Sequence, residues 1–369
     1  MPISAVDAIN PAFQHAKKQL IQPFRIGQWS RLAFVGFLAG ELSSGGSCNV
    51  PNFQMPQTQS GSHKLWAAAP PWMPANPVLA AALIAGAIIV AIMLWLGFAY
   101  LNSMMRFVLF DSIINKECRI REYWSRRMRP GFRYFLWQLG FGLCLLMAMT
   151  ILLGIPAAIA LAAGWLNNPS QHLAPLILGG IFLFFVFLAL FICAMLIVVF
   201  TKDFVVPQMA LEDISALEGW RRFWVMLKAE QGGYAGYVGM KIVLAIGASI
   251  IIGIVTFIVI LVVAIPAGGI GVVIAILASK TAHLTWNAYT ITLVVIAASV
   301  LLTIILFLVG FISVPASVFF PAYSIHFLAS RYRALDAVLH PVPPTPPAPP
   351  EFSPPPILPP FPPEPDPIG

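Results

Sequence analysis

The sequence has few charged residues: 21 Lys and Arg and 14 Asp and Glu among 369 residues, or 9%, whereas a soluble domain carries roughly 25%. So few charges cannot cover the surface of a soluble domain of this length, which excludes a cytosolic enzyme. Cysteine is also scarce, and four cysteines in a chain this long exclude a secreted disulfide scaffold. Hydrophobic residues make up 59% of the chain and the mean hydropathy is +0.86, which excludes a wholly disordered chain. An integral membrane protein remains.

Six apolar runs predict an all-α integral membrane protein with six transmembrane helices arranged as three hairpins. A helix needs about 20 apolar residues to cross a bilayer. Five runs reach that length, and a sixth, 29–42, is shorter and carries Arg31 and Glu41 near its ends. The predicted spans are 29–42, 78–101, 134–165, 173–200, 237–265 and 288–320. Together they form a membrane domain over residues 29–340.

The positions of Lys and Arg predict the orientation. With six spans, only Lys64 and Lys280 of the 21 basic residues fall in outer loops. Because basic residues collect on the cytoplasmic side, both termini are expected in the cytoplasm. Tryptophans near the predicted span ends fit the aromatic belts of a membrane protein: Trp29, Trp124 and Trp137 on the inner side, and Trp66, Trp72, Trp165 and Trp286 on the outer side. A five-helix alternative, which omits 29–42, would place the four N-terminal bases outside.

The two ends of the chain differ from the membrane domain. Residues 1–28 contain a predicted amphipathic interfacial helix, capped by Asn10 with Pro11 at its first position; Phe13, Ala16 and Leu20 are expected on one face. Residues 341–369 hold 16 of the 33 prolines, no base and three acids. This tail is expected to be disordered or polyproline II. It is either a spacer or a docking segment for a protein partner.

The first two inner loops are rich in both bases and apolar residues, which is typical of helices that lie in the headgroup plane. In the second loop, Ser215 and Glu218 fit a capping box. Apolar residues follow at helical spacing: Ile214, Leu217, Trp220, Phe223, Trp224 and Leu227. The bases of both loops predict contacts with lipid headgroups: Arg119, Arg121, Arg126, Arg127, Arg129, Arg221, Arg222 and Lys228. A role limited to tethering the loops is the alternative.

The inner ends of the second, fourth and sixth spans also resemble one another. They read Phe107–Asp111, Phe204–Gln208 and Val318–Ala322, and the first two are followed by Trp124 and Trp220. The pattern indicates three related hairpins. Independent selection of aromatic residues and proline at helix ends is the alternative.

No arrangement of residues predicts a chemical reaction. Phosphate-binding loops, nucleophile elbows and Cys-x-x-Cys pairs are all missing, so we expect no enzyme activity, cofactor, metal or nucleic-acid partner. The span centres lack charge, which argues against charge-coupled transport; Glu41 and Lys241 lie near span ends and are expected to snorkel. Cys144 and Cys193 are expected to be small buried packing residues. Three outer-loop histidines leave a zinc enzyme as a weaker alternative: His63, His172 and His283.

Proline and glycine interrupt some of the apolar runs. Gly154 and Pro156 lie within the third predicted span, and Pro266 to Gly269 lie at the end of the fifth. Such breaks are ordinary kinks or turns, or parts of an uncharged binding site. The ten apolar residues 270–279 beyond the second break are either a re-entrant piece or a short interfacial helix on the outer side.

The segment from Asp203 to Lys228, which contains Asp-Phe-Val-Val-Pro-Gln-Met-Ala and later Gly-Trp-Arg-Arg-Phe-Trp, resembles an inner loop of uncharacterised bacterial multi-pass membrane proteins. These are distantly similar to the membrane domain fused to glycerophosphodiester phosphodiesterases. The match covers about 30 residues, and the phosphodiesterase domain is missing, so its activity is not carried over. The resemblance implies a bacterial inner membrane.

These features together predict a non-enzymatic inner-membrane protein that contacts membrane lipids, with anionic headgroups as candidate ligands, and acts as a scaffold or accessory subunit. The alternative is a permease for a lipid-like or uncharged solute. A polar cavity between the hairpins would favour the permease, whereas a solid apolar bundle would argue against it.

Overall fold

The computed structural model describes residues 3–22, 24–41, 77–165, 172–281 and 288–341, and this part of the chain is helical without strands. The N-terminal helices are α1 (Ile9–Ile21) and α2 (Ile26–Leu38). The long helices are α3 (Pro77–Ile114), α5 (Met128–Ala162), α6 (Leu173–Phe200), α9 (Gln231–Thr281) and α10 (Ala288–Ala329). The short elements are α4 (Ile120–Arg126), the π-helical turn η3 (Thr201–Val205), α7 (Val206–Glu212), α8 (Ala216–Ala229) and α11 (Arg333–Leu339). The Pro-rich tail lies outside the described residues.

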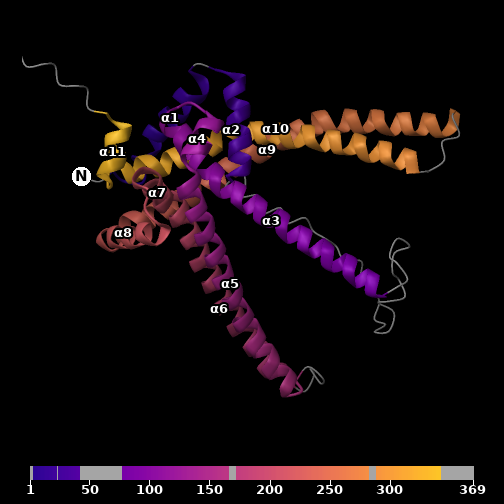
Figure 1. Ribbon diagram of the computed structural model, residues 1–369, viewed down its shortest axis with the longest axis horizontal. Coiled ribbons are helices and arrows are strands. Elements are labelled where there is room, and N and C mark those ends of the chain that lie inside the picture. Colours follow the sequence, from indigo (N-terminus) through magenta and orange to yellow (C-terminus); the bar gives the residue numbers. More distant parts are fainter. Residues whose placement is uncertain (1–2, 23, 42–76, 166–171, 282–287, 342–369) are drawn as a thin grey trace, which may run out of the picture.

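Three helical arms extend from a common group of helices, which we call the head (Figure 1). The head consists of α1, α2, α4, α7, α8, α11 and the adjoining ends of the long helices. One arm is α3, the second is the antiparallel pair α5/α6, and the third is the pair α9/α10. In the described part of the chain, these five helices are long and apolar enough to cross a membrane. The membrane-protein prediction is therefore supported, with five candidate spans rather than six.

The predicted span 29–42 corresponds to α2, which has only 13 residues and is about 20 Å long. It packs on α3 and α10 at the head and runs across the line of the α9/α10 arm (Figure 1). Its end is held by Asn102, whose side-chain amide donates to the Leu38 carbonyl at 2.9 Å. By itself α2 is too short for a crossing, and the structure does not confirm a sixth span.

The predicted helix breaks do not end the helices. Pro156 lies inside α5 and Pro266 inside α9. Residues 270–279, predicted as a re-entrant or interfacial piece, continue α9 to Thr281, so both alternatives are wrong. Prolines can remain within long apolar helices because neighbouring groups satisfy the freed carbonyls.

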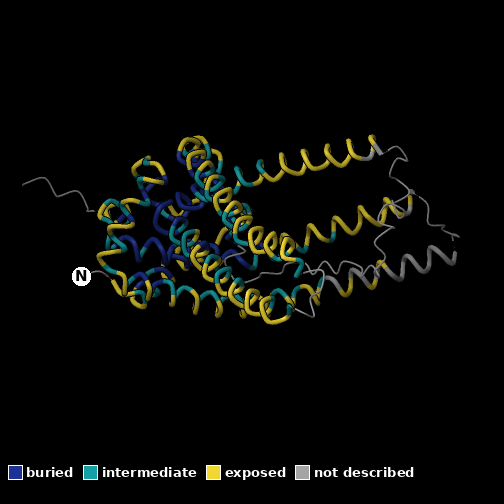
Figure 2. The backbone as a smooth tube through the Cα atoms, turned by 90° about the horizontal axis from the view of Figure 1, so that it is seen from below, coloured by how far each residue is buried: buried dark blue, intermediate teal, exposed yellow. Residues whose placement is uncertain are grey.

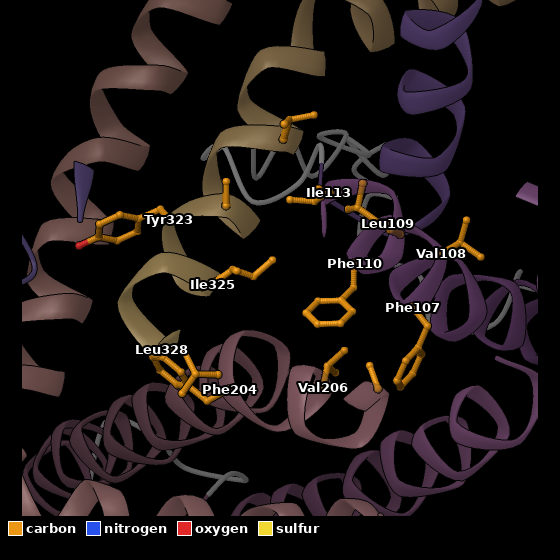
Figure 3. Packing of buried hydrophobic residues seen from close by; sticks show 14 of the residues in the cluster. Phe107, Val108, Leu109, Phe110, Ile113, Phe204, Val206, Tyr323, Ile325 and Leu328 are labelled. Atoms are coloured by element: carbon orange, nitrogen blue, oxygen red, sulfur yellow. The ribbon is translucent and has the colours of Figure 1, made fainter. Parts of the chain in front are cut away.

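The inner ends of α3 and α10 and the η3–α7 segment after α6 meet in one buried apolar core (Figure 3). Phe107, Phe204 and Val318, each from one of the three similar segments, are fully buried there. Phe204 stacks on Phe223 of α8 with ring centroids 5.2 Å apart. The residues that resembled one another in sequence are therefore core residues of the head.

Burial falls along each arm away from the head (Figure 2). The most apolar window of every candidate span is 0% buried. Cys144 in α5 and Cys193 in α6 are exposed, which corrects the prediction that they are buried packing residues. Of the three cysteines among the described residues, Cys118, in the head, is buried.

The N-terminal helix packs on protein. α1 contacts α10 extensively, and Tyr323 of α10 donates a hydrogen bond to the Ala5 carbonyl at 3.0 Å. Ala16 and Leu20 are buried as one face, but Phe13 is exposed, which corrects the predicted face. The helix begins at Ile9 with Ala8 at the N-cap, so the predicted cap Asn10 lies inside the first turn.

Candidate functional site

A cluster of charged side chains lies where the arms leave the head. The π-helical turn η3 turns Lys202 and Asp203 inward from the end of α6. Lys202 Nζ lies 2.6 Å from Glu41 Oε1. Asp203 accepts a hydrogen bond from Tyr237 of α9 at 3.0 Å and forms an ion pair with Lys241 one turn further along α9. Glu41 and Lys241, predicted to snorkel to the headgroups, are thus paired inside the protein.

Arg106 of α3 adds a further positive charge to this cluster. Its guanidinium donates to the Tyr134 hydroxyl at 2.8 Å and to the Ala39 carbonyl at 3.0 Å. Its Nε is buried without a hydrogen-bond partner among the described residues. The cluster of Arg106, Lys202, Lys241, Glu41 and Asp203 therefore has three positive and two negative groups. Removing one partner of a buried ion pair is costly, so the cluster restricts how the end of α2, α3, η3 and α9 meet.

A small cavity adjoins the cluster on the side of the head. Its volume is about 30 Å³, and its lining includes the charged residues Glu41, Arg106 and Lys202 and the apolar residues Phe110 and Ile325. A cavity of this size with charged groups in its lining has room for a water molecule or two. The cavity can hydrate the ion pairs, but it cannot hold an organic solute.

Another buried ion pair joins α3 to the start of α5. Arg127, at the N-cap of α5, binds both carboxylate oxygens of Asp111 at 2.7 Å and also donates to the Ala210 carbonyl. Arg127 was predicted to contact lipid headgroups. The structure instead places its donors inside the head.

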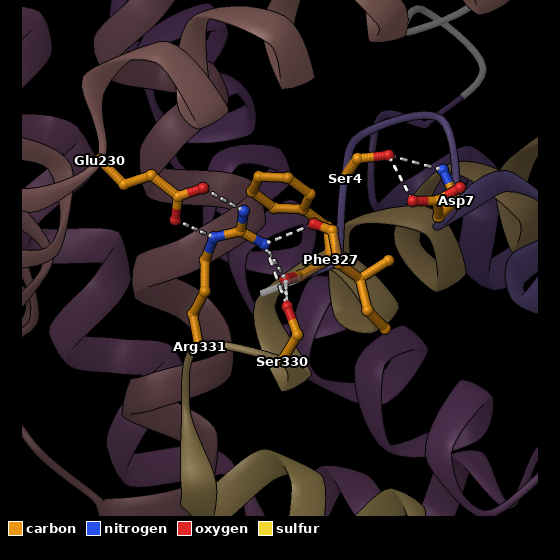
Figure 4. A network of polar contacts seen from close by, with 7 residues as sticks. Ser4, Asp7, Glu230, Phe327, Ser330 and Arg331 are labelled. Atoms are coloured by element: carbon orange, nitrogen blue, oxygen red, sulfur yellow. Dashed lines mark hydrogen bonds and ion pairs between the residues drawn. The ribbon is translucent and has the colours of Figure 1, made fainter. Parts of the chain in front are cut away.

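A further ion pair, between Arg331 and Glu230, lies in the head beside the first described residues. Arg331 binds both oxygens of Glu230 at 2.7 and 2.8 Å, and its guanidinium lies 3.8 Å from the centre of the Phe327 ring (Figure 4). It also donates to the Ile3 carbonyl at 3.1 Å. The hydrogen bonds from Arg331 lower the pKa of Glu230. This pair links the end of α10 to the turn before α9.

The other predicted headgroup residues lie at the surface, in two groups. Arg119 pairs with Glu117 and Glu122, Arg221 with Glu218, and Arg222 with Glu212 and Glu218. Arg121, Arg126 and Arg129 are exposed, and Lys228 lies over the Trp224 ring at 5.6 Å. The prediction that these residues contact headgroups stays a prediction.

The second inner loop forms the predicted helix α8, and the Glu218 amide donates to Ser215 Oγ at 3.3 Å as expected for a cap. Its apolar residues divide between two faces. Phe223 is fully buried in the head, while Leu217 and Trp224 are exposed. The helix therefore has an inner face that holds it on the head and an outer face that no described residue covers.

The described residues contain no group of three His, Cys, Asp or Glu side chains that could hold a metal ion. Of the three outer-loop histidines, His172 precedes α6, whereas His63 and His283 lie outside the described residues. The zinc alternative therefore stays untested.

Sequence reasoning missed the ion-pair cluster. The sequence does contain one indication of the cluster, because the charged residues Lys202 and Asp203 directly follow the apolar run 173–200. Charged residues at a span have a partner or a function. The partners could not be identified, because Glu41 is far away in the chain.

The arms are apolar and long enough to cross a membrane, and they join at a head that is held by ion pairs. These features define a helical membrane protein. Residues 3–338 match the model of a family of unknown function, DUF7544, and the chain belongs to that family. Neither a curated protein nor a solved structure matches the chain. The family is uncharacterised, as predicted, whereas the likeness to the phosphodiesterase-associated membrane domain stays a prediction.

Proposed function

We propose that the protein is a non-enzymatic membrane scaffold or accessory subunit whose arms contact lipid. The observation that carries this proposal is the contrast between the head and the arms. The head is packed and held by buried ion pairs, while the most apolar window of each candidate span is 0% buried. Apolar side chains such as Trp95, Phe182 and Ile251 therefore face the surroundings.

The wide separation of the apolar arms is consistent with lipid as their surroundings. Lipid tails are as apolar as Leu or Ile side chains, so no hydrophobic force draws the arms together inside a bilayer. Contacts at the head can then determine how far the arms stand apart. A protein of this shape offers three separate apolar surfaces to lipid or to the helices of a larger assembly.

The arrangement of the termini supports the predicted even number of crossings. α1 and α11 both pack in the head, whereas α3 starts at the far end of its arm (Figure 1). We propose that the head lies on the cytoplasmic side of a bacterial inner membrane, because 19 of the 21 bases were predicted on that side.

The cavity at the ion-pair cluster, which is lined by residues of α3, η3 and α10, is too small for a solute path between the arms, and this favours a scaffold over the alternative permease. A larger groove on the surface of the head lies outside that region. A permease for a lipid-like or uncharged solute needs a site that accepts the solute, and small-molecule sites are usually about 300–1,000 Å³. The cavity at the ion-pair cluster is about 30 Å³.

Native cysteines allow a direct test of lipid contact. Full-length protein carrying Cys48→Ser would be spin-labelled at Cys144 and Cys193, which are exposed on adjacent helices, and reconstituted in lipid bilayers. We expect both labels to collide with dissolved oxygen, which concentrates in the bilayer, and not with a water-soluble nickel complex. Cys118, buried in the head, is the control and should label poorly. Labels protected from both reagents would show that protein covers the arm, and would overturn the lipid-contact proposal.

A further inference from the structure

An open groove lies on the surface of the head between α2 and α4. Its volume is about 580 Å³, which is within the usual range for small-molecule sites. Arg31 comes from α2, and the remaining lining residues come from the start of α4 and its approach: Arg119, Ile120, Arg121, Glu122 and Ser125. Two separate elements therefore bring three guanidinium groups to one groove.

The charge of the groove is positive after its internal pairs are counted. Arg119 is neutralised by Glu117 at 2.9 Å and by Glu122 at 3.5 Å. Within the described part of the chain, neither Arg31 nor Arg121 forms an ion pair. The Arg31 guanidinium makes only a long contact with the Cys118 carbonyl, at 3.5 Å. Three guanidinium groups and the carboxylates of Glu117 and Glu122 leave a net charge of +1 at the groove, and the Arg31 and Arg121 guanidinium groups have no ion-pair partner among the described residues. Such groups suit a phosphate, because guanidinium binds phosphate oxygens in pairs.

Aromatic residues place the groove at the level of the membrane surface. Trp124, on the same short helix as Arg121, lies edge-on to Tyr100 of α3 with ring centroids 6.4 Å apart. Phe135 of α5 lies against the same tyrosine at 5.7 Å. Tyr100 lies at the end of the predicted span 78–101. Trp and Tyr collect where a bilayer meets water, so α4 lies at headgroup level.

Apolar surface continues from the groove along α2. Phe34 follows Arg31 by one helical turn and is 54% exposed, and Phe37 follows on the same side at 46%. A cationic groove that continues into exposed phenylalanines has the two properties that a phospholipid requires. The groove can take the phosphate, and the phenylalanine surface can take the acyl chains.

We propose that this groove is a phospholipid site in which Arg31 and Arg121 bind the headgroup phosphate and the outward face of α2 contacts the acyl chains. The site prefers a lipid with net negative charge, because a quaternary amine would meet the same guanidinium groups. This inference rests on the proposed lipid contact of the protein and adds a specific site to it. A phosphorylated solute shares the phosphate chemistry, and the test below separates the two sources.

The test measures binding of tail-labelled phosphatidylglycerol and phosphatidylcholine to full-length protein in detergent micelles. The variant Arg31→Gln/Arg121→Gln removes two charges from the groove. The matched control Arg126→Gln/Arg129→Gln removes two exposed charges outside it. We expect the groove variant to lose about tenfold in affinity for phosphatidylglycerol while the control changes little. Wild type should bind phosphatidylcholine more weakly.

Three results would overturn the proposal. Equal losses in both variants would show attraction to general surface charge, and no loss in either would show that the groove does not bind lipid. Displacement of the labelled lipid by glycerol 3-phosphate at equal concentration would identify a soluble phosphate ligand instead. Thermal unfolding verifies the fold of each variant, and if the double variant is unstable, Arg121→Gln against Arg126→Gln makes the same comparison. Since the arms are tested separately by their spin labels, failure of this site is distinguishable from failure of the proposed function.

Discussion

Glu41 and Lys202 form an ion pair of 2.6 Å in which the side chains are only 3% and 13% exposed. Glu41 follows α2 and Lys202 belongs to the π-helical turn after α6, so the pair joins the N-terminal part of the head to the α5/α6 arm. Removing one partner leaves the other charge buried without the group that it contacts. The consequences of this pair and of four other features can be measured.

Replacement of Lys202 by Met should destabilise the protein by about 3–5 kcal/mol, because Glu41 would remain charged and buried. The double variant Glu41→Gln/Lys202→Met should recover part of the loss. Thermal unfolding of the detergent-solubilised protein, analysed as a double-mutant cycle, measures the coupling. Strictly additive effects of the two substitutions would show that the pair contributes nothing.

Arg127 and Arg126 are adjacent in the sequence but differ in environment. Arg127→Gln removes three donors from Asp111 and Ala210 and should cost about 3 kcal/mol or more of stability. Arg126→Gln changes an exposed side chain and should stay within about 0.5 kcal/mol of wild type. Chemical denaturation of the two variants under one set of conditions makes the comparison. Similar small effects would show that Arg127 is not held in the head.

The two faces of α8 should respond differently to truncation. Phe223→Ala leaves a hole among Phe200, Phe204 and Tyr234 and should cost about 3–5 kcal/mol. Trp224→Ala, on the exposed face, should have little effect on unfolding in detergent, although it removes the ring below Lys228. If Trp224→Ala were the more damaging substitution, the packing of α8 on the head would have the opposite orientation.

The burial of His15 should make the folded protein less stable in acid. Burial lowers the pKa of His15, and Lys116 and Lys18 lower it further. The His15 ring donates from Nε2 to the Ile113 carbonyl at 2.9 Å and lies edge-on to His326 of α10 at 5.4 Å. The folded protein therefore keeps His15 neutral, while the unfolded chain gains a proton below about pH 6.5. This contribution to stability is complete above that pH and decreases as the pH falls toward the folded pKa.

We expect the unfolding temperature of the wild type to fall between about pH 7.5 and pH 5, and His15→Gln to show a smaller fall. His340→Gln is a matched control, since His340 is exposed and pairs with Asp336. A pH dependence unchanged by His15→Gln would contradict the assignment to His15.

The two ends of the described chain should lie on the same side of the membrane. Single cysteines would be placed at the exposed positions Phe13 and Val338, and at Leu79 near the start of α3, in a background with the four native cysteines replaced by serine. A membrane-impermeant maleimide applied to intact cells should leave positions 13 and 338 unlabelled and label position 79. Labelling of only one of the two ends from outside would exclude an even number of crossings.

The sequence determined the features that depend on local composition and periodicity. Scarce charge and long apolar runs predicted a helical membrane protein because the cost of placing charge in hydrocarbon applies to each segment separately. The Ser215 cap and helix α8 followed from neighbouring residues. Five long helices were predicted at overlapping positions, although α3, α9 and α10 run beyond their predicted ends and α9 includes residues 270–279.

Only the tertiary structure decided what the charged residues contact. Composition and spacing could not show that Glu41 pairs with Lys202, Lys241 with Asp203, or Arg127 with Asp111. The amphipathic pattern of α1 fits a lipid surface and a protein surface equally well, and the structure placed that helix on α10. The physical reason is that a local pattern specifies which face of a helix avoids water, whereas the partner of that face, or of a charge, depends on which distant segments the fold brings within contact distance.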